Sequence, residues 1–241
     1  MPGLGEVPRE VVADLAARVT QRRVNAGTHI VEQGKASAAL VMIARGAAKT
    51  VRAVTDDDHP LREEIVVGVL RGPTLVPDAS ILDGQPAGSS VVALRSSQLL
   101  CVDRAIVVRF GHPSIVRALA ARFALEMRAQ ERRVEHLVVG TVEARIRRLL
   151  DALSADHGTP LGSGRFIAIP LRRRDLASMI NATTETVSRL LAKLEREGEA
   201  RTTRDGIWWR RRTEIEAPRE SGVVLKRGHE APPPRGKTSD G

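Results

Sequence analysis

The chain has 241 residues, of which 42% are hydrophobic, and it carries a formal net charge of +9 at pH 7. This hydrophobic content is enough to form the cores of two modest domains. The positive net charge is typical of a protein that binds a polyanion such as DNA, or an anionic membrane surface. No apolar run approaches the roughly 18 residues of a membrane-spanning helix, and the N-terminal MPGLGEVPREV lacks a signal-peptide core, so we expect a cytoplasmic protein with no membrane partner.

The N-terminal half reads as an all-β roll. A short amphipathic helix is expected around residues 9–19, and short β-type runs separated by Gly, Pro and Asp clusters fill residues 24–103. The expected strands lie at Ile30–Gly34, Leu40–Gly46, Val51–Val54, Ile65–Leu70 and Val91–Leu94. The spacing Ile30-x3-Gly34-x5-Leu40-x2-Ile43-x2-Gly46 resembles the glycine frame of cyclic-nucleotide-binding jelly rolls.

In that domain type, a Glu bonds the ribose and an Arg pairs with the cyclic phosphate. The matching segment here is residues 76–94, VPDASILDGQPAGSSVVAL, in which Pro77 replaces the Gly, Asp78 the Glu and Ala87-Gly88 the Arg-Ser pair. A phosphate buried without its counter-charge costs several kcal/mol, so we expect no ordinary cyclic AMP binding. Arg71 or Arg95 is either a substitute cation or a surface residue. The degenerate effector pocket is expected to comprise Asp78, Ala79, Ala87, Gly88, Ser89 and Gln130, holding another effector or none.

The titratable residues do not predict a metal site or a cofactor. Cys101 is the sole cysteine and lies in an apolar run, which excludes an intrachain disulfide and a four-Cys cluster and favours a buried side chain. The acidic turn at residues 55–60 is interpreted as a solvated loop. The six histidines are scattered without metal-ligand spacing, and a haem ligand among His29, His59 or His112 remains an alternative.

A long helix is expected over residues 114–137. Its apolar stripe recurs at steps of three and four and consists of Ile115, Leu119, Phe123, Met127, Gln130, Val134 and Leu137. Such a stripe packs either on its own β-roll or on a second copy. Residues 143–153 then begin another helix, and a Gly-containing loop over residues 155–164 leads to a strand at residues 165–169.

Residues 171–198, LRRRDLASMINATTETVSRLLAKLEREG, read as two short helices joined by a tight turn. The first has Leu171, Leu176, Met179 and Ile180 on one side, and the second has Val187, Leu190, Leu191 and Leu194. Asn181 tolerates a left-handed turn, and Thr183 or Thr184 can cap the second helix. This arrangement is a helix-turn-helix.

The second helix carries polar residues where a DNA-reading helix needs them. Thr184, Glu185, Ser188 and Arg189 fall opposite the leucines, at the end that enters the major groove. Arg can bond guanine and Glu can accept from cytosine, although a solvated, salt-bridged surface face would have the same composition. Arg172, Arg173, Arg174, Lys193 and Arg196 surround this face with positive charge. Beyond Gly198, an Asp-Gly turn at residues 204–206 predicts a two-stranded wing, with one of the adjacent tryptophans packed under the helix.

The segment IPLRRRDLASMINATTETVSRLLAKLEREG resembles the winged helix-turn-helix of the CRP/FNR family of bacterial transcription regulators, whose signature runs roughly LTRxDLAxxxGxxxETVSRxLxxLExxG. By resemblance Glu185, Ser188 and Arg189, with Thr184, read bases. Arg172 replaces the usual capping Thr, and Thr184 stands where some members have a second reading Arg. The expected DNA-backbone residues are Arg172, Arg173, Thr183, Lys193 and Arg204.

The resemblance implies an α+β fold with four parts: a cyclic-nucleotide-binding-like sensor roll at 1–112, a dimerisation helix at 113–140, a winged helix-turn-helix at 141–212 and a disordered tail at 213–241. The implied partners are double-stranded DNA with a palindromic operator, a second copy of the chain, and RNA polymerase if the protein activates transcription. No nucleophile–base or paired-carboxylate arrangement suggests an enzyme. The alternative is a signalling module that binds cyclic di-GMP or haem and acts mainly through protein contacts.

Overall fold

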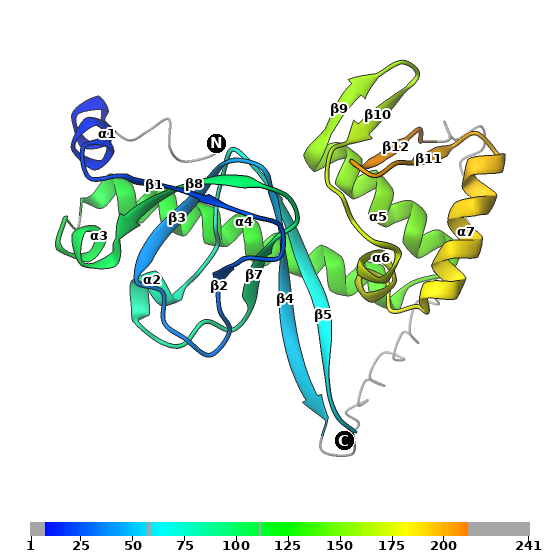
Figure 1. The fold of residues 1–241 in the computed structure, drawn as a ribbon, viewed down its shortest axis with the longest axis horizontal. Helices are drawn as coiled ribbons and strands as arrows, with labels where there is room; N and C mark the ends of the chain where they lie inside the picture. The colour runs from blue at the N-terminus through cyan, green and yellow to red at the C-terminus, as the bar shows by residue number, and fades with distance from the viewer. Residues whose placement is uncertain (1–7, 57–58, 111, 212–241) are drawn as a thin grey trace, which may run out of the picture. The chain divides into compact units, whose positions relative to one another are not determined.

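The computed structural model describes residues 8–56, 59–110 and 112–211, and its N-terminal part is a β-roll of two antiparallel sheets (Figure 1). One sheet has the order β1-β8-β3-β6 and the other β2-β7-β4-β5. Their strands are β1 (Thr20–Val24), β2 (His29–Val31), β3 (Ala39–Arg45), β4 (Ala47–Asp56), β5 (His59–Arg71), β6 (Thr74–Leu75), β7 (Ser90–Ala93) and β8 (Ser97–Asp103). The predicted roll is confirmed. Of the acidic turn, residues 57–58 lie outside the described ranges.

The core of the roll is formed by side chains that alternate between buried and more exposed positions along the strands. In β8, Ser97, Leu99 and Cys101 are buried at every second position, as expected for a strand with one face inward. Burial raises the pKa of the Cys101 thiol, which fits the predicted buried side chain. Helices α1 (Arg9–Ala16), α2 (Ser80–Asp83) and α3 (Arg104–Phe110) complete this part.

The long helix α4 (Pro113–Val138) follows the roll, close to its predicted bounds. His112 caps it by accepting a hydrogen bond from the Ser114 N–H at Nδ1 (3.3 Å), and Pro113 occupies the first turn, where no N–H is required. Gly140, with φ +86°, separates α4 from α5 (Val142–His157) in a conformation that disfavours other residues. Within the described residues, no helix combines the length and hydropathy needed to cross a membrane.

The C-terminal part contains α5, α6 (Arg173–Met179), α7 (Thr184–Arg196) and a four-stranded antiparallel sheet of order β11-β12-β10-β9 (Figure 1). Its strands are β9 (Gly158–Leu161), β10 (Gly164–Ile167), β11 (Ala200–Thr202) and β12 (Ile207–Trp209). The prediction of a loop over residues 155–164 is wrong. Helix α5 continues to His157, and residues 158–161 form an edge strand, a position in a sheet that tolerates a proline such as Pro160.

Candidate nucleic-acid interface

The turn between α6 and α7 has the geometry that the sequence predicts. Asn181 adopts φ +50°, the left-handed conformation that Asn accepts more readily than most residues. Thr183 is the N-cap of α7, and its Oγ1 accepts from the Thr186 N–H at 3.2 Å. Leu171 precedes α6 rather than belonging to it, because Arg172 is extended (ψ 158°) and serves as the N-cap residue. Asp175 completes that cap by accepting the Arg172 backbone N–H at 2.9 Å.

Helix α7 is strongly two-faced. Val187, Leu191 and Leu194 are fully buried in the core of the C-terminal part. The opposite face exposes Glu185 and Arg189, whose side chains are 79% and 72% accessible and approach to 3.7 Å. An exposed ion pair of this kind contributes little to stability, so Glu185 and Arg189 can each leave the pair and bind a new partner at a small cost in free energy.

The remaining predicted base readers lie at the same end of α7. Thr184 is exposed, and Ser188 is half-buried, with its Oγ donating to the Thr184 carbonyl at 2.8 Å. Because a hydroxyl also has acceptor lone pairs, Ser188 keeps hydrogen-bonding capacity for a base edge. The structure therefore places Thr184, Glu185, Ser188 and Arg189 together on the N-terminal half of one helix.

The predicted backbone-contact residues differ in their surroundings. Arg172 and Arg173 are exposed at the start of α6, and Arg204 is exposed at the turn between β11 and β12. Lys193 has another partner: its Nζ lies 2.8 and 3.0 Å from the two carboxylate oxygens of Glu143. This pairing, chiefly the hydrogen bond from Lys193, lowers the pKa of Glu143. The Lys193 charge is thus neutralised within the chain, which weakens its assignment as a phosphate contact.

The wing forms as predicted, and its tryptophans have separate roles. Trp209 is 2% exposed, packs in the same core as α7, and donates from Nε1 to Asp151 Oδ1 of α5 at 2.8 Å. Trp208 is half-buried and donates to the Leu161 carbonyl at 2.9 Å. The Trp209 indole therefore holds the sheet to α5, and the Trp208 indole connects β12 to the edge strand β9 of the same sheet.

Helix α6 is held by strands β4 and β5 of the roll. Lys49 Nζ and Asp175 Oδ1 lie 2.7 Å apart, with side chains only 11% and 2% exposed. The Val66 N–H donates to Ser178 Oγ at 2.8 Å, and Val51 and Val66 share the apolar core of the helix-turn-helix. The same Asp175 thus caps α6 and pairs with the roll.

A cavity of about 400 Å³ in the roll is lined by all six residues that were predicted for the effector pocket, Asp78, Ala79, Ala87, Gly88, Ser89 and Gln130. Asp78 is already engaged: its carboxylate accepts from the hydroxyls of Ser37 and Ser80. Neither Arg71 nor Arg95 lines the cavity; Arg71 donates to the His157 carbonyl at 2.9 Å instead. The cation among its lining residues is Arg52 of β4, which sequence reasoning missed.

The predicted stripe on α4 divides into buried and exposed residues. Ile115 and Leu119 are 7% and 3% exposed because they pack on α1, α3 and β8 of their own chain. Gln130 donates to the Val67 carbonyl of β5 at 3.2 Å, Leu137 lines a cavity against α5, and Phe123 is half-buried on the roll. Of the seven residues, Met127 and Val134 are exposed, at 66% and 61%.

Met127 and Val134 share the exposed surface of α4 with other apolar residues. Val116, Leu125 and Val138 are also exposed, at 49%, 37% and 78%, so the exposed large apolar residues described on α4 lie at positions 116, 125, 127, 134 and 138. Positions 127, 134 and 138 are separated by seven and four residues, the steps of a heptad pattern, and form the exposed stripe of α4. The period alone could not tell which residues of the stripe the roll covers.

Comparison with known proteins gives two family matches. Residues 21–111 match the model of the cyclic nucleotide-binding domain, and residues 144–217 match that of the Crp-like helix-turn-helix domain.

Curated relatives match along most of the chain. The cyclic AMP receptor protein of Thermus thermophilus is 29% identical over 202 residues, covering 82% of this chain and 86% of the relative. A "Probable transcriptional activator" of Rhizobium leguminosarum is 28% identical over 202 residues, covering 82% and 80%.

Solved structures share the fold. A c-di-GMP responsive global regulator of Xanthomonas campestris matches with TM-score 0.67 and 17% identity, over 85% of this chain and 100% of that chain. FixK2 of Bradyrhizobium japonicum matches with TM-score 0.67 and 18% identity, over 80% and 93%.

Proposed function

The chain belongs to the CRP/FNR family of bacterial transcription regulators, and from this premise we propose that it works in the cytoplasm as a homodimer that binds a palindromic operator. The observation that carries the proposal is the outward face of α7, where Glu185 and Arg189 are exposed beside Thr184 and Ser188. Two copies of this helix enter successive major grooves, about 34–36 Å apart along the duplex.

In this proposal each polar residue of α7 has a separate role. Arg189 donates two hydrogen bonds to guanine O6 and N7, and Glu185 accepts from cytosine N4. Ser188 and Thr184 supply further contacts to base edges. The exposed ion pair of the free chain keeps the Arg189 and Glu185 side chains extended from the helix before DNA arrives.

Phosphate contacts position the helix. We assign this role to Arg172, Arg173, Thr183 and Arg204, which are all exposed around α7. Lys193 joins them only by leaving Glu143. Each phosphate contact releases counterions, so binding should weaken steeply with salt.

The second copy is proposed to bind along α4. The exposed stripe that includes Met127, Val134 and Val138 offers the apolar surface that a parallel helix pair buries. The proposed division of the chain is a sensor roll at 1–112, a dimerisation helix at 113–140 and the DNA-binding domain at 141–212. If the regulator activates, RNA polymerase is its further partner.

The roll is proposed not to respond to cyclic AMP in the usual way. In the 400 Å³ cavity, Asp78 is tied to two serines, Ala87 and Gly88 carry no charge, and Glu126 adds a second carboxylate. Arg52 lies on a strand and is exposed, so it offers a weaker counter-charge than a buried arginine.

A signalling module that acts mainly through protein contacts is the second candidate, because this cavity is retained. It would be preferred if the chain bound cyclic di-GMP or haem tightly and showed no preference among DNA sequences.

Parallel selections of bound sites from random DNA test the proposal, using the wild type, Arg189→Ala and the control Arg128→Ala. Arg128 is also an exposed arginine, but it lies on α4 away from α7. The wild type and the control should enrich the same motif. Arg189→Ala should lose preference at one base pair per half-site, about 1–3 kcal/mol. If Arg189→Ala enriched the unchanged motif, Arg189 would not be a base reader.

A further inference from the structure

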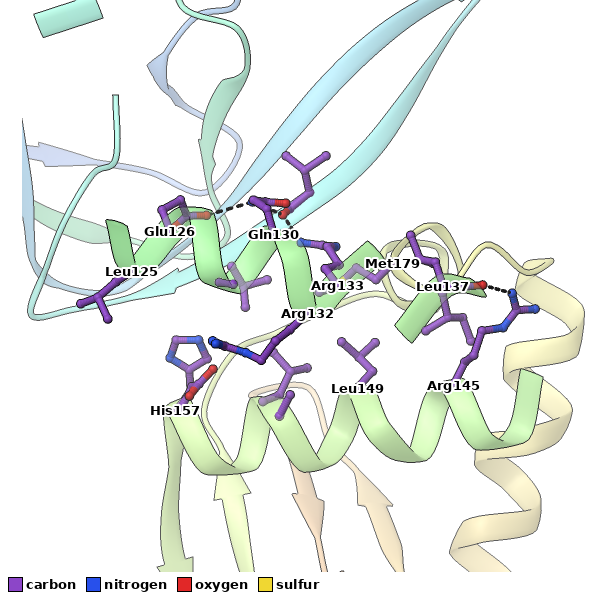
Figure 2. A pocket seen from close by; sticks show the side chains of 18 of the residues that line it. Leu125, Glu126, Gln130, Arg132, Arg133, Leu137, Arg145, Leu149, His157 and Met179 are labelled. Carbon is purple, nitrogen blue, oxygen red and sulfur yellow. Dashed lines mark hydrogen bonds between the residues drawn. The ribbon is translucent and has the colours of Figure 1, made fainter. Parts of the chain in front are cut away.

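A second cavity, separate from the pocket of the roll, lies between β5, α4, α5 and the end of α6 (Figure 2). Its volume is about 320 Å³, at the small end of ligand sites in proteins. Its apolar lining includes Leu125, Leu149 and Met179. Its charged lining consists of Arg122, Arg132, Arg133 and Arg145 against Glu126 and Asp156. Cations therefore outnumber carboxylates around a partly apolar space.

Two of these arginines already have partners. Arg122 lies 3.2 Å from Glu126, and Arg133 donates to the backbone carbonyls of Val66 and Val67. Burial lowers the pKa of Arg133, a sign that this wall of the cavity is shielded from water. Electrostatic attraction to a charged ligand is stronger in such surroundings than at an open surface.

The other two arginines have spare donors. Arg145 uses Nη1 to bond the Leu137 carbonyl at 3.0 Å, but its Nε is buried and has no acceptor among the described residues. Arg132 has no hydrogen bond or ion pair within the part of the chain that the structure describes. Figure 2 shows Arg145 beside Leu137 at one end, Arg132 near His157 at the other, and Leu149 between them.

A buried N–H without an acceptor is rare, because it has lost its water without gaining a partner. An oxygen of a bound anion would restore the missing hydrogen bond and balance the excess of arginines. The apolar floor at Leu149 and Met179 would at the same time favour a ligand with a nonpolar body over a bare inorganic ion.

We propose that this cavity binds a small amphipathic anion, whose carboxylate or phosphate accepts a hydrogen bond from Arg145 Nε and whose apolar body lies over Leu149 and Met179. The site is distinct from the pocket of the roll and goes beyond the DNA-binding function. Since its lining joins β5 of the roll to Met179 of α6, a ligand here contacts both the sensor and the helix-turn-helix. It would shift the balance between conformations that hold these elements differently.

Calorimetry on the full chain without DNA tests the site, with decanoate, adenosine 5′-monophosphate, inorganic phosphate and neutral decanol as probes. The variants are Arg145→Met and the control Arg128→Met, which removes an exposed arginine of α4 outside the cavity. Decanoate or the monophosphate should bind the wild type with Kd below about 1 mM, and inorganic phosphate and decanol about tenfold more weakly. The preferred probe separates a carboxylate ligand from a phosphate ester. Arg145→Met should lose about tenfold and Arg128→Met almost nothing.

A second measurement on the wild type keeps the test valid if Arg145→Met does not fold. In ¹⁵N spectra, the Nε–H resonance of Arg145 should shift on titration with the bound probe. The proposal is overturned if no anionic probe binds the wild type, if decanol binds as tightly as decanoate, if folded Arg145→Met binds equally well, or if the Arg145 resonance does not move. Because no DNA is present, these results are independent of operator binding.

Discussion

The buried pair between Lys49 and Asp175 supplies a sharp test of how α6 is held. Lys49→Met removes the cation and leaves a carboxylate that is 2% exposed, with the Arg172 N–H at 2.9 Å as a remaining donor. Breaking a buried pair in this way costs about 3–5 kcal/mol. At about 2–4 °C per kcal/mol for a chain of this size, the midpoint of thermal unfolding should fall by about 6–20 °C.

The chain offers a matched control and a specific reporter. Lys35→Met makes the same substitution in a pair with Glu32 whose side chains are 70% and 52% exposed, so we expect a loss below about 1 kcal/mol. The only tryptophans, Trp208 and Trp209, lie in the C-terminal sheet, so their fluorescence during urea unfolding reports on that part.

The double variant Lys49→Met with Asp175→Asn completes the cycle. It should be less destabilised than the sum of the single variants, because neither charge is then buried alone. Equal midpoints for Lys49→Met and Lys35→Met would show that the 2.7 Å pair does not hold α6 to the roll.

Three further outcomes follow from the structure. Met127→Glu with Val134→Glu places carboxylates on the exposed stripe of α4, so sedimentation should show a monomer with at least about tenfold weaker operator binding; an unchanged dimer would exclude this stripe. Burial lowers the pKa of His157 in the folded chain; the charge of Asp156 raises this pKa and that of Arg71 lowers it further. As the pH drops, His157 is therefore protonated in the unfolded chain before it is protonated in the folded chain. The free energy of unfolding should therefore fall as the pH drops from about 6.5 through the lower folded pKa, and His157→Gln should flatten that fall in urea titrations; an identical slope would contradict it. Calorimetry with cyclic AMP should show no binding with Kd near or below about 1 μM, and such tight binding would contradict the proposed loss of the phosphate site.

The sequence pattern predicted those features that depend on residues close to one another in the chain. The cap at Thr183, the left-handed Asn181 and the apolar face of α7 all follow from residues within a few positions of each other. The edge strand β9 escaped prediction because Gly158 and Pro160 resemble a loop until the pairing with β10 is known.

Contacts between distant segments could not be predicted. Lys49 and Asp175 are 126 residues apart in the chain, and no periodicity connects them. For the same reason, a heptad pattern on α4 could not reveal that the roll covers Ile115 and Leu119 and leaves Val116 exposed. Arg52 and Arg145 acquire their significance only from the cavities that they line.

In the proposed function, two copies of α7 read a symmetric DNA sequence. The most direct measurement compares the affinity of the wild-type chain for its selected palindrome with that for the same duplex after both half-sites are scrambled, at physiological salt. Binding to the palindrome should be at least about 10³-fold tighter, with two chains per duplex. Equal affinity for the two duplexes would contradict it.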